Sequence, residues 1–115
     1  MHLNLLVLKS ARMERLVSFY KTLGIRFEHH QHQRGPFHYA AEVGDMVFEI
    51  YPLPENESVN TSIRLGFSIA NLDTAINQLR NAGVKIAREP KQTEWGYIGI
   101  VEDPDGRKVE LKQLT

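Results

Sequence analysis

The chain has 115 residues, and its 14 lysines and arginines balance its 14 aspartates and glutamates, so the formal net charge is zero. This length predicts one domain, and the neutral charge argues against binding to nucleic acid or a membrane surface through bulk electrostatics. The absence of cysteine excludes a disulfide framework, a thiolate metal site and a cysteine nucleophile. No apolar run reaches the length of a signal peptide or a membrane span, so we expect a cytoplasmic protein.

The first half of the chain predicts a strand, an amphipathic helix and three further strands. The strand is the apolar stretch "LNLLVL" (residues 3–8), and the helix lies within "ARMERLVSFYKTLG" (residues 11–24). Apolar side chains recur there at helical spacing, at Leu16, Phe19, Tyr20 and Leu23. Gly24 follows the helix, where a left-handed cap favours glycine. The later strands reverse direction through "QRGPF" and through Gly44-Asp45, a two-residue hairpin signal.

The second half repeats this order after the polar stretch "PLPENESVN". The strand "SIRLGFSI" (residues 62–69) precedes a helix with apolar positions at Leu72, Ala75, Ile76 and Leu79. Asp73 lies in the first turn of this helix, Gly83 lies just past its end, and Asp105-Gly106 is a second hairpin signal. The sequence therefore predicts an α+β fold of two tandem β-α-β-β-β modules in a single domain, residues 1–115. Module one covers about residues 1–53 and module two about residues 62–115.

Each module has a glutamate at the centre of an apolar strand, Glu49 in "VFEIY" and Glu110 in "KVELK". Burying an ionised carboxylate is costly unless it meets a cation, a hydrogen-bond donor or a metal. Two equivalent glutamates therefore suggest a site. The alternative for Glu110 is an exposed strand residue paired with Lys108 or Lys112.

Strand register predicts the neighbours of Glu49. If Gly44-Asp45 is a two-residue loop, Ala40 opposes Glu49. In the same register His38 opposes Tyr51, and both share a face with Glu49. We therefore expect His38 to act as a general acid or base and Tyr51 to contact a ligand. The alternative for His38 is a hydrogen-bonded histidine in a cavity wall.

Two further pairings follow if the other turns are symmetric. A symmetric turn through "QRGPF" pairs His32 with His38, which makes His32 a second candidate for ligand binding. In the second module, the Asp105-Gly106 hairpin places Glu110 opposite Val101.

Several longer motifs resemble one known superfamily. They are "FYKTLGI" (residues 19–25), "FEIYP" (residues 48–52), "FSIANLDTAINQLRNAGVKI" (residues 67–86) and "WGYIGIVEDPDGRKVEL" (residues 95–111). The chain resembles the vicinal oxygen chelate superfamily, which includes glyoxalase I, bleomycin- and fosfomycin-resistance proteins, and extradiol dioxygenases. The resemblance implies a glyoxalase-like fold in which a mixed sheet curls around a cavity, a small-molecule ligand or substrate, and a homodimer.

The resemblance also implies one divalent metal ion, Ni, Zn, Mn or Fe, held by one ligand from each of four strands. Two of these ligands are glutamates that match Glu49 and Glu110, and the other two are His or Gln from the first strand of each module. In the second module this first-strand position holds Arg64. In the first module its register is open between Leu3 and Asn4, with His2 on the face of Asn4, so His2 is the third candidate ligand.

Three functions remain open from the sequence. The first is a metal-dependent lyase or isomerase, in which the metal polarises a carbonyl and Glu110 or His38 moves a proton. Arg64 in place of a metal ligand argues against glyoxalase I activity itself. The second is a metal-free protein that binds a small anionic or aromatic ligand through Arg64, Tyr51 and Trp95. Trp95 either closes over such a ligand or plugs the end of the core. The third is a stand-alone module whose duplicated faces mainly serve dimerisation.

Overall fold

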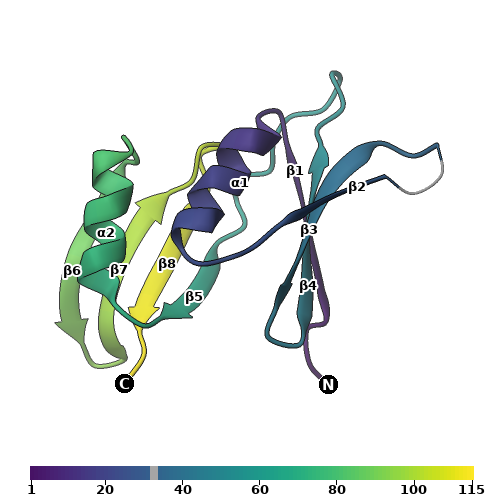
Figure 1. Cartoon of the computed structure of the whole chain (residues 1–115). Helices are drawn as coiled ribbons and strands as arrows, with labels where there is room; N and C mark the ends of the chain where they lie inside the picture. The colour runs from purple at the N-terminus through teal and green to yellow at the C-terminus, as the bar shows by residue number, and fades with distance from the viewer. Residues whose placement is uncertain (32–33) are drawn as a thin grey trace. The chain divides into compact units, whose positions relative to one another are not determined.

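The computed structural model of the chain describes residues 1–31 and 34–115. The chain folds into two compact units, Met1–Val59 and Asn60–Thr115 (Figure 1). The first unit contains β1 (Leu5–Ser10), α1 (Met13–Thr22), β2 (Glu28–Gln31), β3 (Phe37–Val43) and β4 (Met46–Pro52). The second unit contains β5 (Leu65–Ile69), α2 (Leu72–Asn81), β6 (Ile86–Thr93), β7 (Gly96–Glu102) and β8 (Lys108–Gln113).

Each unit forms its own four-stranded mixed sheet. The strand orders are β1-β4-β3-β2 and β5-β8-β7-β6, and the sheets are not closed. In each sheet the first strand pairs in parallel with the last, and the remaining pairs are antiparallel. The predicted α+β class and the tandem β-α-β-β-β order are therefore confirmed. The single-domain assignment and the module boundaries stay predictions.

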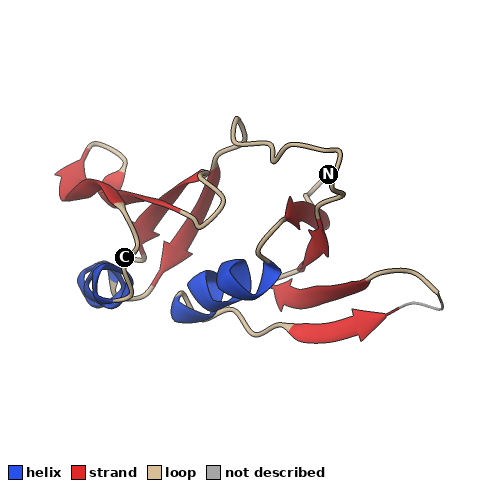
Figure 2. Cartoon of the chain, turned by 90° about the horizontal axis from the view of Figure 1, so that it is seen from above, coloured by secondary structure: helices blue, strands red, loops and turns tan. Residues whose placement is uncertain are grey.

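The helices have the predicted buried faces. Helix α1 contacts β1 and β4, and helix α2 contacts β6, β7 and β8 (helices blue and strands red in Figure 2). The buried side chains are Leu16, Phe19 and Tyr20 in α1, and Leu72, Ala75, Ile76 and Leu79 in α2. The glycine predicted after each helix has a left-handed backbone, with φ of 99° at Gly24 and 86° at Gly83. Within the described part of the chain, no helix is long and apolar enough to cross a membrane.

One predicted register is confirmed and another is wrong in the first unit. Strand β3 pairs with β4 so that Ala40 opposes Glu49, as the two-residue loop requires. Strand β2, however, pairs with β3 so that His30, not His32, opposes His38. Gln31 pairs with Phe37, so five residues connect the two strands, whereas a symmetric turn centred on Gly35 allows only three between Phe37 and its partner. His32 itself lies outside the described residues.

The predicted pairing of Glu110 with Val101 is also wrong, because Glu110 pairs with Ile100. The turn is longer than a two-residue loop. Gly106, with φ of 95°, donates its N–H to the Asp103 carbonyl oxygen at 2.9 Å, and Asp103 donates its own to the Arg107 carbonyl oxygen at 2.8 Å. This arrangement is typical of a type I turn followed by a left-handed glycine, which shifts the register by one residue.

Candidate functional site

Glu49 lies on the face of the first sheet that does not hold the core residues. The core residues of β4, Phe48 and Ile50, are fully buried on the other face. In β1, which runs parallel to β4, Val7 is the partner of Glu49, and Leu5 is the partner of Val47. Because side chains alternate along a strand, Leu5 and Val7 share the face of Glu49.

His38 lies beneath Glu49 on this face. Its Nε2 is 3.4 Å from Oε2 of Glu49, and its Nδ1 is 3.4 Å from the Pro36 carbonyl oxygen. The His38 ring stacks on the Tyr51 ring, with centroids 4.3 Å apart and planes 4° apart. Only 1% of the His38 side chain is exposed, against 18% for Glu49. A ligand on this surface therefore reaches Glu49 before His38.

The face of the sheet that carries Glu49 and His38 continues onto β2, where it carries His30. The His30 ring lies 5.9 Å from the His38 ring, centroid to centroid, and its Nε2 is 3.0 Å from Oε2 of Glu28. The structure thus brings together His38, Glu49 and Tyr51 as the sequence predicted, and it adds His30 in the place expected for His32.

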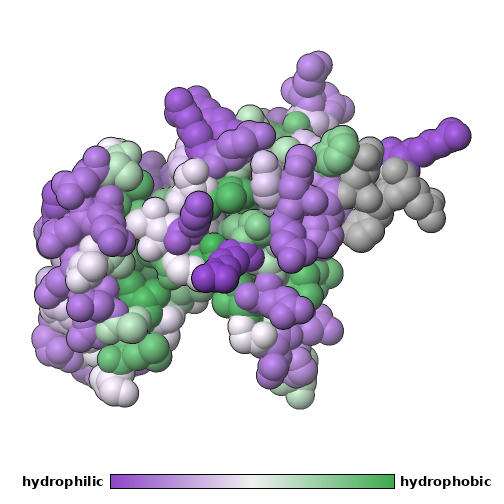
Figure 3. Space-filling view, in the orientation of Figure 1, coloured by the Kyte–Doolittle hydropathy of each residue, from purple (hydrophilic) through white to green (hydrophobic). Residues whose placement is uncertain are grey.

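The surface beside Glu49 is apolar. The apolar strip consists of Leu5, Val7 and Val47, whose residues are 48%, 43% and 39% exposed. Figure 3 shows that apolar residues, in green, reach the surface among the hydrophilic ones. Lys9, the lysine of β1, lies on the same face and forms an ion pair with Glu57 at 3.2 Å. This strip was not predicted, although "LLVL" places apolar residues on both faces of β1.

Glu110 has different neighbours in the second unit. It is half-buried on β8, between Gly66 of β5 and Ile100 of β7. Lys108, one of the two lysines considered as alternative partners of Glu110, forms its ion pair with Glu102 instead, at 3.1 Å. The hydrogen bond from Lys108, with smaller contributions that include Lys85, holds the pKa of the Glu102 carboxyl below its usual range.

The two other predicted ligand contacts of the second unit are both exposed. Arg64 precedes β5, and no ion pair within the described residues includes it. Trp95 lies in the turn between β6 and β7 and is 70% exposed, so it does not plug the core. Thr93 holds this turn, because its Oγ1 accepts the Trp95 N–H and donates to the Gly96 carbonyl oxygen.

The strand registers identify the first-strand positions that the resemblance assigns to metal ligands. Val7 pairs with Glu49 as Gly66 pairs with Glu110, so Leu5 is the equivalent of Arg64. The choice between Leu3 and Asn4 was therefore wrong. His2 precedes β1 and is exposed.

The donors around the two glutamates do not fit a divalent ion. Leu5 and Val7 have no ligand atom, and neither has Gly66. No group of three or more His, Cys, Asp or Glu among the described residues could hold a metal. The metal-ligand roles of Glu49, Glu110 and His2 stay predictions.

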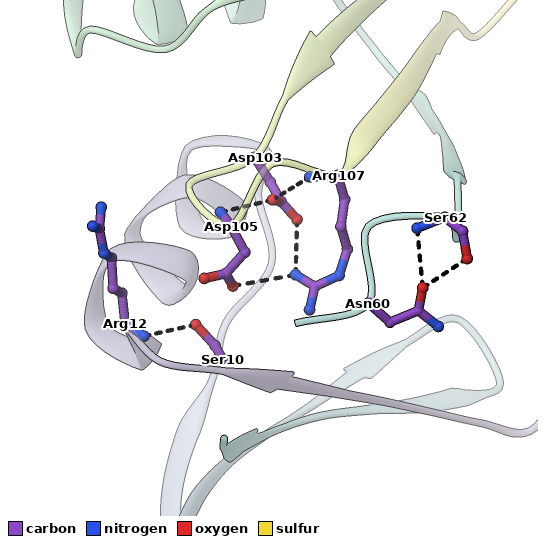
Figure 4. A network of polar contacts seen from close by, with 7 residues as sticks. All are labelled: Ser10, Arg12, Asn60, Ser62, Asp103, Asp105 and Arg107. Atoms are coloured by element: carbon purple, nitrogen blue, oxygen red, sulfur yellow. Dashed lines mark hydrogen bonds and ion pairs between the residues drawn. The ribbon is translucent and has the colours of Figure 1, made fainter. Parts of the chain in front are cut away.

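A buried ionic cluster in the second unit was not predicted (Figure 4). Arg107 donates from one terminal nitrogen to Asp103 at 3.1 Å and to Asp105 at 3.2 Å. The other Asp103 carboxylate oxygen accepts the backbone N–H groups of Asp105 and Arg107. The motif "DPDGR" carries the signal, since its turn residues bring both acids back to the arginine.

Comparisons with known proteins give one family match and several solved structures of similar fold. No curated protein matches the chain. Among solved structures, TnmS3, an antibiotic binding protein from Streptomyces sp. CB03234, is 23% identical with a TM-score of 0.78, over 100% of this chain and 97% of that chain. A glyoxalase/bleomycin resistance protein/dioxygenase family enzyme from Burkholderia phytofirmans PsJN is 15% identical with a TM-score of 0.76, over 100% of both chains. A protein from the mobile metagenome of V. Pseudocholerae is 28% identical with a TM-score of 0.70, over 100% of this chain and 95% of that chain. Because the family model matches residues 2–111, nearly the whole sequence, the chain belongs to the Glyoxalase/Bleomycin resistance protein/Dioxygenase superfamily.

Proposed function

We propose that this protein binds a small organic molecule without a metal ion, on the Glu49 face of the first sheet. The proposal rests on one observation: the residue beside Glu49 on β1 is Val7, which has no metal-ligand atom. Val7 belongs to an exposed apolar strip, so this surface offers apolar contact around one carboxylate. A ligand-binding role is consistent with the fold, because TnmS3, with the same fold, is an antibiotic binding protein.

In this proposal Glu49 contacts the ligand and His38 positions Glu49. The carboxylate is partly exposed, whereas the imidazole is buried beneath it and stacked on Tyr51. The stacking restricts the His38 ring to one orientation, which keeps Nε2 facing the carboxylate. This geometry supports a positioning role for His38 in place of the general acid or base role expected from the sequence.

The alternative function, a metal-dependent lyase or isomerase, is supported by one contact. Nε2 of His38 lies close to Oε2 of Glu49, and histidine and glutamate are both common metal ligands. Metal analysis of the purified protein, with a thermal-shift panel of Ni, Zn, Mn and Fe ions, separates the two functions. A stoichiometric metal that is lost in Glu49→Gln would overturn the binding proposal.

The binding proposal predicts a ligand-induced rise in Tm with metal-free protein. A thermal-shift screen of small organic molecules in the presence of EDTA should find compounds that stabilise the wild type, by mass action on the folded state. Glu49→Gln should reduce the shift. Glu55→Gln, which removes an exposed carboxylate from the β4–β5 connection, is the matched control and should leave the shift unchanged.

The expected homodimer and cytoplasmic location are also proposals. Size-exclusion chromatography with light scattering measures the mass in solution, and a mass near 13.2 kDa would exclude the dimer at the concentration used. Cell fractionation followed by immunoblotting tests the location.

A further inference from the structure

We infer that the ligand is an amphipathic cation, an amine joined to an aliphatic or aromatic body. This inference rests on the proposed function and names the chemical class of the ligand at the same surface. It is carried by the juxtaposition of the Glu49 carboxylate with the apolar strip formed by Leu5, Val7 and Val47.

The charge of the ligand follows from what binding does to Glu49. The Glu49 side chain still has 18% of its surface exposed, and a ligand that covers it removes that water contact. A neutral body would bury the carboxylate without compensation, and an anion would be repelled by it. An amine replaces the lost water with a charge-assisted hydrogen bond.

Among the described residues, Glu49 forms no ion pair with a lysine or arginine. Lys9, on the same face of β1, pairs with Glu57. Glu42, which opposes Val47 on β3, is exposed and adds a second negative charge at the other end of the face. His38 approaches Glu49 from the buried side at a single carboxylate oxygen, Oε2. The charge of the described surface therefore complements a cation.

The size of the apolar body follows from strand geometry. Leu5 and Val7 are two residues apart along β1, and Val47 and Glu49 are two residues apart along β4. A two-residue step is about 6.6 Å, and adjacent strands are about 4.8 Å apart. A body of one or two fused rings, or a chain of about six carbons, covers such a strip when its amine lies at Glu49.

The test uses three compounds that share one body and differ only in the polar group. They are 1-naphthylmethylamine, 1-naphthylmethanol and the carboxylate 1-naphthaleneacetate. Each is titrated into metal-free protein, and binding is followed by calorimetry and by NMR. The amine should bind at least about tenfold more tightly than the alcohol, and the acid should bind more weakly than both. Raising the salt concentration should weaken binding of the amine alone.

Two variants separate the charge from the apolar contact. Glu49→Gln should abolish the preference for the amine over the alcohol while binding of the alcohol persists. Val7→Ser should weaken all three compounds by a similar factor. Urea unfolding verifies that each variant is folded, and Val47→Ser replaces Val7→Ser if that variant is unfolded.

The outcomes distinguish this inference from the proposed function. If the alcohol or the acid binds as tightly as the amine, the inference is overturned and the proposed function stands. If none of the three compounds binds and the wider screen finds no other ligand, both fail. If Val7→Ser converts a dimer to a monomer and leaves amine binding unchanged, the apolar strip is an interface between copies, and the inference is overturned.

Discussion

Replacing Arg107 by methionine should destabilise the second unit strongly. The Arg107 side chain is 2% exposed, and the carboxylates that it neutralises, Asp103 and Asp105, are 0% and 5% exposed. Methionine retains much of the apolar length of arginine but provides no charge and no donor. Arg107→Met therefore leaves two acidic side chains with little access to water and without their cation.

The magnitude follows from which contacts the variant keeps. Removing one partner of a buried ion pair typically costs about 3–5 kcal/mol. In Arg107→Met, one Asp103 carboxylate oxygen still accepts two backbone N–H groups, at 2.9 and 3.0 Å, because the backbone is unchanged. We therefore expect the lower end of that range, about 3 kcal/mol. For a chain of this size the loss corresponds to a fall in Tm of about 10 °C.

Urea unfolding at pH 7, followed by circular dichroism, measures this loss in the free energy of unfolding. The control is Lys9→Met, which removes a cation from an exposed ion pair and should cost less than about 1 kcal/mol. Adding Asp103→Asn to Arg107→Met should restore part of the stability, because it removes one uncompensated charge. If Arg107→Met is as stable as the wild type, or if Asp103→Asn lowers its stability further, the electrostatic reasoning is refuted.

Two smaller effects are also expected in the second unit. Because the pKa of Glu102 is lowered by its hydrogen bond from Lys108, its contribution to stability is present above the unfolded pKa, about 4.5, and is lost as the pH falls through the folded value. The stability difference between the wild type and Glu102→Gln should thus shrink in urea titrations as the pH is lowered below about 4.5; a difference that stays constant at acidic pH would contradict this. Gly96→Ala should cost about 1–3 kcal/mol, because φ is 128°, a backbone conformation that strains any residue with a Cβ, whereas the Lys112 Cε at 2.9 Å from the new Cβ can move aside. Gly66→Ala, whose new Cβ would make no close contact, is the control. If Gly96→Ala and Gly66→Ala have equal Tm values, the backbone strain inferred at Gly96 is refuted.

Features set by local signals could be predicted from the sequence. Both helices have apolar residues every three or four positions, a spacing that places them on one side of a helix. Each helix is followed by a glycine with positive φ. The Gly44-Asp45 loop is short enough to determine its own register, so the position of His38 beside Glu49 followed from counting residues outward.

The two wrong pairings have a common cause in the turns. A turn with an added left-handed residue, or a connection that is longer than expected, shifts the register by an amount that the strand sequences do not determine. Gly106 shifted the pairing of Glu110 in this way, and the five-residue connection between Gln31 and Phe37 gave His38 the partner His30. The exposure of Trp95 could not be predicted either, because the sequence around one tryptophan does not distinguish a core position from an exposed turn.

The duplication places equivalent residues in both units, and their differences distinguish the surroundings of Glu49 from those of Glu110. The registers make Ile98 the equivalent of His38 and Lys112 the equivalent of Tyr51, so the second unit has no histidine stacked beneath its glutamate. Gly66 stands where the first unit has Val7, and it adds no apolar side chain beside Glu110. A carboxylate next to a buried histidine ring and bordered by an exposed apolar strip is therefore a property of the first unit.

The divergence of the two units also bears on the metal. The four-ligand metal arrangement that the resemblance implies needs a donor on the first strand of each module, and the equivalent positions hold Leu5 and Arg64. A leucine provides no ligand atom, and a guanidinium repels a divalent cation. Restoring histidine at both positions, in Leu5→His with Arg64→His, would supply the two missing donors. Should that double variant bind nickel or zinc when the wild type does not, these two residues alone would account for the missing donor set.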